Sequence, residues 1–134
     1  LRSVPPEKAG YRYAPEKWSI REVVGHLADT ERIMSYRALS IGRGDPAPLP
    51  GMEPDDWMAG STFEACSLPD LVTELENVRR CTVSLFRHFS PEAWARTGVA
   101  SDNPVSVRAL AYIIAGHERH HVEILKTRYL GVPA

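Results

Sequence analysis

Three of the five histidines in this 134-residue chain have the spacing to bind one divalent metal ion. His117 and His121 are four residues apart, so on a helix that advances roughly 100° per residue they lie about 40° apart on one face. Two imidazoles at this spacing can share a cation, and His26 from an earlier helix would supply a third nitrogen. Such a site leaves a coordination position for water or substrate, which suits Lewis-acid catalysis.

Apolar neighbours indicate that these imidazoles point into a core. Residues on the same helix faces as the three histidines are Val23, Ile33, Met34, Leu110, Ile113, Ile114, Ile124 and Leu125. A polar group buried without a partner costs about 1–3 kcal/mol, so three imidazoles need hydrogen-bond partners or a shared ligand. A single histidine such as His26 is more often a hydrogen-bonded core residue, but for the three together we favour a metal site. We do not expect His88 to be a ligand, because it lies near a helix end. We do not expect His120 to be a ligand either, because it lies off the apolar face that His117 and His121 share.

Three charged residues are candidates for a supporting role. Arg37 lies within about 20° of the His26 direction on the same helix face, so it could bind an anionic substrate group such as a carboxylate. A salt bridge to an acid at the edge of the core is the alternative for Arg37. Asp29 and Glu118 could orient an imidazole or could instead face solvent.

Residues 117–121 also match H-E-x-x-H, the pattern of zinc peptidases in which the glutamate is the general base. These enzymes take a third ligand downstream, but only 13 residues follow His121, and the lone carboxylate among them is Glu123. They also need a sheet edge to hold an extended peptide, and the sequence predicts none. A zinc peptidase is therefore a minor alternative.

Helical periodicity and capping residues predict the elements that position these side chains. Ser19 and Glu22 form a capping box, Ser67 with Asp70 repeats the pattern, and Ser106 can cap a last helix. Ser90 followed by proline is typical of the start of a short helix. The predicted helices cover residues 20–41, 68–89, 91–94 and 107–130.

Between the first two long helices, residues 42–67 hold four prolines and four glycines, which predicts a long loop. Trp57 and Phe63 could hold that loop against the bundle. Residues 102–104 predict a turn, and no segment alternates with period two for long enough to indicate a sheet. The expected fold is therefore all-α, an up-and-down bundle with one long crossover loop.

Composition limits the possible classes of protein. A length of 134 residues predicts a single domain over residues 1–134. The net charge of -1, from 16 basic and 17 acidic side chains spread along the chain, argues against nucleic-acid or membrane partners. No apolar run approaches 18 residues and no signal segment follows Arg2, so we expect a soluble cytoplasmic protein. Cys66 and Cys81 are too few for a disulfide scaffold and are expected to be reduced thiols.

The residues around the histidines resemble the signature segments of the DinB/YfiT superfamily. These segments are KWSIREVVGHLADTER at residues 17–32 and GHERHH at residues 116–121, and YRAL and LPG in the middle of the chain fit as well. The resemblance implies a four-helix bundle, usually dimeric, in which His26, His117 and His121 hold zinc or nickel. Members of known activity include bacillithiol- and mycothiol-dependent transferases and isomerases, while many others are named only as metal-dependent hydrolases.

The chain departs from the family pattern in two places. Family members usually have another helix before this lead-in, so we expect an N-terminally truncated domain or a partner chain that covers the exposed face. Many members have glutamine where Ile124 stands here, so no role of that amide is carried over.

Two classes of function follow from these observations. The first is a metal-dependent enzyme, a thiol S-transferase or hydrolase acting on a small molecule, in which the cation activates a bound thiol or water. A low-molecular-weight thiol would then be a second cofactor, and the resemblance implies a homodimer. The second is a non-enzymatic, stress-related bundle that binds a metal or ligand without turnover.

Overall fold

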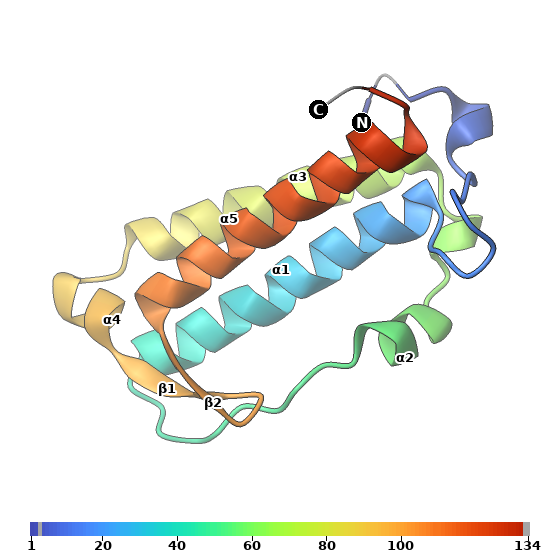
Figure 1. The fold of residues 1–134 in the computed structure, drawn as a ribbon. Coiled ribbons are helices and arrows are strands. Elements are labelled where there is room, and N and C mark those ends of the chain that lie inside the picture. The colour runs from blue at the N-terminus through green and yellow to red at the C-terminus, as the bar shows by residue number, and fades with distance from the viewer. Residues whose placement is uncertain (3, 133–134) are drawn as a thin grey trace.

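Three long helices form the body of the protein in a computed structural model that describes residues 1–2 and 4–132. They are α1 (Ile20–Gly42), α3 (Leu68–Arg87) and α5 (Val107–Ile124), and α1 packs along both of the others. The chain between α1 and α3 runs back along the bundle, so α1 and α3 point in the same direction and α5 in the opposite one (Figure 1). The predicted all-α class and the long crossover are confirmed.

Each long helix begins at a serine cap, as predicted. The Ser19 hydroxyl accepts a hydrogen bond from the Glu22 backbone N–H at 3.2 Å, and the Glu22 carboxylate accepts one from the Ser19 N–H at 2.7 Å. Such caps satisfy N–H groups that lack partners within the helix and contribute about 1 kcal/mol each. The helices α3, α4 (Pro91–Ala95) and α5 have only the first of these two bonds: the hydroxyls of Ser67, Ser90 and Ser106 accept from a backbone N–H of the first turn.

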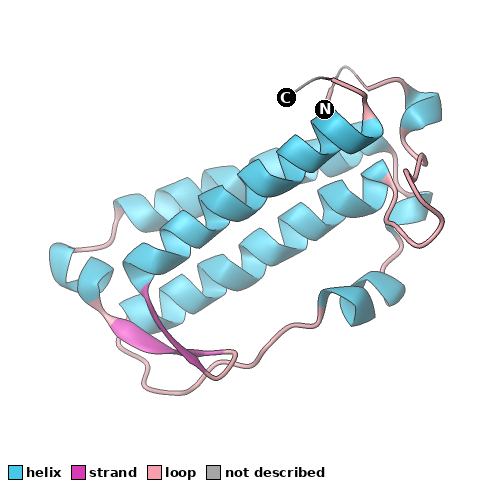
Figure 2. Cartoon of the chain, in the orientation of Figure 1, coloured by secondary structure: helices cyan, strands magenta, loops and turns pink. Residues whose placement is uncertain are grey.

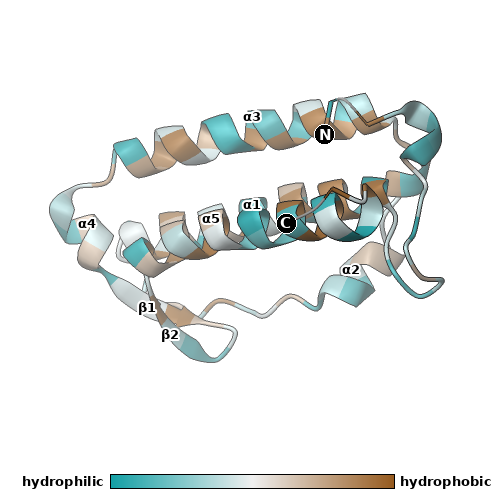
Figure 3. Cartoon of the chain, turned by 45° about the horizontal axis from the view of Figure 1, so that its top comes forward, coloured by the Kyte–Doolittle hydropathy of each residue, from teal (hydrophilic) through white to brown (hydrophobic). Residues whose placement is uncertain are grey.

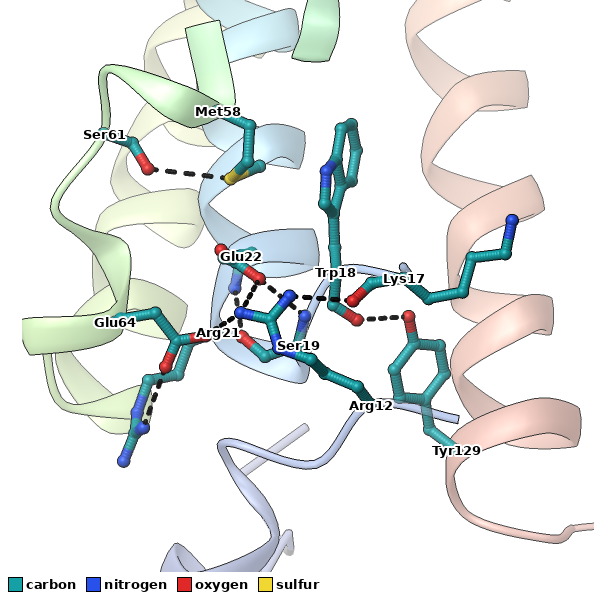
Figure 4. A network of polar contacts seen from close by, with 10 residues as sticks. All are labelled: Arg12, Lys17, Trp18, Ser19, Arg21, Glu22, Met58, Ser61, Glu64 and Tyr129. Atoms are coloured by element: carbon teal, nitrogen blue, oxygen red, sulfur yellow. Dashed lines mark hydrogen bonds and ion pairs between the residues drawn. The ribbon is translucent and has the colours of Figure 1, made fainter. Parts of the chain in front are cut away.

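A polar network ties the N-terminal lead-in to the start of α1 and to the end of the last helix (Figure 4). Arg12 forms an ion pair with Glu22 at 2.8 Å, and the Tyr129 hydroxyl donates to the Trp18 carbonyl at 2.6 Å. Tyr129 closes a π-helical segment, Leu125–Tyr129, that continues α5. These contacts hold Trp18 in place between the start of α1 and the end of the chain.

A two-stranded antiparallel sheet stands where only a turn was predicted (Figure 2). Its strands are β1 (Thr97–Ala100) and β2 (Asn103–Ser106). The turn residues Ser101 and Asp102 have φ values of 51° and 61°, the positive φ pair that a two-residue type I′ hairpin requires. Strands of four residues are too short to reveal an alternating pattern, which is why periodicity missed them.

The predicted loop and the lead-in contain short helices that were not predicted. These are α2 (Pro54–Ala59) and the 3-10 turns η2 (Phe63–Ala65) and η1 (Pro6–Lys8). Phe63 holds the crossover against α1 as expected, and a Cβ at Gly25 would lie 2.5 Å from its ring, so the close approach depends on that glycine. Trp57 was expected to act in the same way but is 47% exposed, and Met58 is buried in its place.

Two apolar clusters fill the bundle, and a polar layer separates them. One cluster surrounds the start of α1 and the end of the chain, and the other joins the end of α1 to α4, the hairpin and the start of α5. Apolar residues of α3 gather along the side that faces α1 and α5 (Figure 3). None of the described helices is long and apolar enough to span a bilayer. The middle of α1 carries the buried polar residues His26, Thr30, Glu31 and Arg37. Because buried polar groups need partners, this layer decides what the protein can bind.

Candidate metal centre

Three imidazoles from distant parts of the sequence meet in the polar layer. His26 Nε2 lies 3.0 Å from His117 Nε2, and one ring nitrogen from each of His26, His117 and His121 lies within 4.8 Å of the other two. We call these residues the histidine cluster. The structure thus brings together the three histidines that the sequence singled out, while their role as metal ligands stays a prediction.

The histidine cluster borders a cavity rather than lying wholly inside the core. His26 is buried at 6% exposure, but His117 and His121 are half-buried. Ile113 was expected in the same apolar stripe and is instead 41% exposed. Among the long helices α5 packs mainly against α1, so its buried stripe is narrower than periodicity predicts.

Burial keeps the three imidazoles neutral at neutral pH. Desolvation lowers the pKa of His26 and of His121 to about 4, with a smaller contribution from the neighbouring imidazoles. The pKa of His117 is lowered for the same reason. A neutral imidazole keeps the lone pair that metal coordination requires.

The donor set fits a divalent transition-metal ion. Imidazole suits zinc and nickel, and a tetrahedral ion with bonds of about 2.0–2.1 Å places its ligand nitrogens about 3.3 Å apart. The separations of 3.0 Å to at most 4.8 Å require only small ring movements to reach that value. A hydrogen bond between His26 and His117 is the alternative, but it leaves His121 with no hydrogen-bond partner among the described residues. One shared ion would satisfy all three.

The histidine cluster forms one wall of a cavity of about 430 Å³, within the usual range of about 300–1,000 Å³ for small-molecule sites. Apolar side chains make up much of the remaining lining: Trp18, Ile33, Met34, Met52 and Pro54. No described aspartate or glutamate lines it. A larger groove of about 750 Å³ between α1 and α3 contains none of the histidines, so we place the chemistry in the smaller cavity.

Arg37 lines the same cavity from further along α1. Its Nη2 donates to the Pro50 carbonyl at 2.8 Å and to the Ser101 hydroxyl at 3.0 Å. The alternative of a salt bridge to an acid is wrong for the described residues, because none of their ion pairs includes Arg37. Burial lowers the pKa of Arg37.

Glu118 and Asp29 lie outside the cavity. Glu118 is bound by Arg79, which also holds the buried Glu31 through hydrogen bonds of 2.8 and 2.9 Å. We call Glu31, Arg79 and Glu118 the ion cluster. A carboxylate engaged in this way is not placed as a general base beside the histidines, which argues against the peptidase alternative. Asp29 pairs with Arg32 at 3.3 Å, and desolvation raises its pKa.

Sequence reasoning missed three residues around the cavity. The Trp18 ring lies 4.8 Å from that of His26, and the Thr30 hydroxyl lies 3.4 Å from His26 Nδ1. Thr30 follows His26 by four residues, so helical spacing could have identified it. Trp18 and Ser101 stand outside the helices, and no local pattern predicts that they reach the cavity.

Comparisons with known proteins agree with the fold and show the family. An Oceanobacillus iheyensis protein, named by inference as a metal-dependent hydrolase, is 27% identical over 128 residues, which are 94% of this chain and 73% of that protein. YfiT from Bacillus subtilis, described as a probable metal-dependent hydrolase with an unusual four-helix bundle topology, matches with a TM-score of 0.77 at 14% identity. That match covers 99% of this chain and 78% of YfiT, so the two share the bundle fold. The DinB superfamily pattern matches residues 1–125, and the chain therefore belongs to the DinB superfamily.

Proposed function

We propose that this protein is a metal-dependent enzyme acting on a small molecule, with His26, His117 and His121 as ligands of one divalent ion. The observation that carries the proposal is the meeting of three imidazole nitrogens within 4.8 Å in the wall of a cavity. Relatives named as metal-dependent hydrolases support the same class of reaction. Zinc and nickel are the metals that best suit the donor set.

The residues of the cavity define what they would contribute. When bound, the ion supplies Lewis-acid chemistry that lowers the pKa of a bound water or thiol. The three neutral imidazoles and the lack of a described acid in the lining leave the charge of the ion uncompensated by the protein. Trp18 and Met52 contribute apolar surface to the lining. Hydrolysis and transfer to a low-molecular-weight thiol are the two reactions we propose.

Metal analysis with an activity panel tests this function. We expect one equivalent of zinc or nickel in wild type, and a loss of affinity of roughly a hundredfold or more in His121→Ala. His120→Ala is the matched control, because His120 is exposed and lies outside the histidine cluster. The panel contains esters, amides, and thiols paired with electrophilic acceptors, and any turnover should be lost when the metal is removed. Sub-stoichiometric metal that does not change in the variants would contradict the site, and tight ligand binding without turnover would support the non-enzymatic alternative.

A further inference from the structure

Arg37 is a buried cation without a counter-ion in the described part of the chain. Its side chain is 7% exposed, and its two nitrogen or oxygen partners, the Pro50 carbonyl and the Ser101 hydroxyl, are neutral. Nη1 contacts only the Met34 sulfur at 3.7 Å, and sulfur is a weak acceptor. The guanidinium therefore keeps both an uncompensated charge and N–H groups for a ligand.

The surrounding backbone holds Arg37 in place. Pro50 belongs to the crossover and Ser101 to the tip of the hairpin, and the neighbouring Leu49 joins these segments. The Leu49 N–H donates to the Val99 carbonyl at 2.9 Å, and the Leu49 carbonyl accepts from the Ser101 N–H at 3.1 Å. Two segments outside the helices thus converge on one arginine side chain. Such pre-organisation lowers the cost of ordering the guanidinium when a ligand binds.

The charge of the cavity favours an anion. No described acid lines the cavity, and Arg37 contributes a full positive charge. A buried charge is costly unless it is paired, and a ligand carboxylate would supply the missing partner. Because Nη2 is already engaged with Pro50 and Ser101, the guanidinium offers a ligand the N–H groups of Nη1 and Nε, and so few free donors favour a carboxylate over a phosphate, which would need more.

We propose that Arg37 binds the carboxylate of an extended small-molecule substrate whose reactive group lies at the histidine cluster, and this proposal rests on the function proposed above. His26 and Arg37 are eleven residues apart on α1, about 16 Å along the helix axis. Both side chains tilt toward the N-terminus of α1 and the arginine side chain is the longer, so the guanidinium lies on the order of 10 Å from the His26 imidazole. Ile33 and Met34 line the cavity on the intervening part of α1. The substrate class is therefore a carboxylate joined to the reactive group by an apolar stretch of several atoms.

Calorimetric titration with paired probes tests the anchor with and without metal. In metal-free protein, hexanoate is compared with hexanamide. In zinc-loaded protein, 6-mercaptohexanoate is compared with 6-mercaptohexanol. We expect the charged member of each pair to bind about tenfold more tightly or better in wild type. Arg37→Met should abolish this preference, because it weakens the binding of the charged probe more than that of the uncharged one.

Two further variants keep the result interpretable. Arg37→Lys retains the charge without the planar fork and should keep part of the preference, which covers the case that Arg37→Met does not fold. Arg43→Met is the matched control, because Arg43 is an exposed arginine outside the cavity and should leave both ratios unchanged. Equal binding of charged and uncharged probes in wild type, or a preference that survives in Arg37→Met, would overturn the proposal. A preference in the metal-free pair together with failure to bind zinc would instead support the anchor and reject the proposed function.

Discussion

The ion cluster and the histidine cluster are neighbours in sequence and in space, yet the partners of their polar groups differ. His117 and Glu118 are adjacent on α5, but Glu118 is held by Arg79, whereas the hydrogen-bonding contact of His117 in the described chain is with another imidazole, that of His26. The ion cluster pairs opposite charges across three helices, while the histidine cluster opens onto a cavity. Polar groups that satisfy one another stabilise the bundle, and polar groups that do not are available for a ligand.

The two arginines of this layer show the same difference. Hydrogen bonding to Glu31, followed by that to Glu118, raises the pKa of Arg79 above its ordinary value. Burial lowers the pKa of Arg37, and no acid in the described chain offsets that shift. Arg79 is thus part of the architecture of the bundle, whereas the charge of Arg37 is paired only when a ligand supplies the anion.

The largest effect is expected from removing the buried acid of the ion cluster. Glu31 is 4% exposed and accepts two hydrogen bonds from Arg79, so Glu31→Ala should lower the free energy of unfolding by about 2–3 kcal/mol. Urea denaturation measures this change. Glu76→Ala, which breaks an exposed ion pair with Arg2, is the control and should lower stability far less, because solvent screens that pair. Equal losses of unfolding free energy in the two variants would show that the ion cluster has no special structural role.

A smaller effect is expected at the hydroxyl beside the histidine cluster. Thr30→Val removes the contact of 3.4 Å with His26 Nδ1 and should weaken zinc affinity by about tenfold, because that contact helps to orient the ring. Competition with a chelator measures the affinity. The free energy of unfolding without metal should stay within about 0.5 kcal/mol of wild type. Unchanged zinc affinity would show that Thr30 does not position the imidazole.

Removing the cap of α5 should lower the stability of the fold without favouring either cluster. Ser106→Ala removes the hydrogen bond from the Ala109 N–H at 3.0 Å and should lower stability by about 1 kcal/mol. The metal stoichiometry should not change, because the cap lies at the opposite end of α5 from His117 and His121. A lower stoichiometry in the folded variant would mean that the site depends on the whole helix rather than on its own residues.

Only a small change in stability is expected at His26, where the loss of metal binding is complete. His26→Leu keeps a side chain of similar size, so the free energy of unfolding without metal should change by less than about 1.5 kcal/mol. Zinc should stabilise wild type in proportion to its occupancy, by about 4 kcal/mol at a thousandfold excess over the dissociation constant, and should not stabilise this variant. If His26→Leu lowered the free energy of unfolding of the metal-free protein by about 3 kcal/mol or more, the histidine cluster would stabilise the fold as the ion cluster does.

The sequence predicts these two regions unequally for a physical reason. The helix starts and the shared face of His117 and His121 follow from local capping and from helical spacing, which act over a few residues. The partner of Glu118 is Arg79, 39 residues away on another helix, and no local pattern connects them. The same holds for Arg37, whose partners lie in a crossover and in a hairpin with strands too short to detect.

X-ray absorption spectroscopy of the zinc-loaded protein tests the central claim most directly, because it counts the imidazoles bound to the ion. For wild type we predict three imidazole nitrogens at about 2.0–2.1 Å together with an oxygen ligand from water. For His26→Leu loaded at high zinc we predict two imidazoles. A wild-type spectrum with one imidazole or none, or with sulfur or several carboxylate oxygens in the first shell, would contradict a metal centre built from His26, His117 and His121.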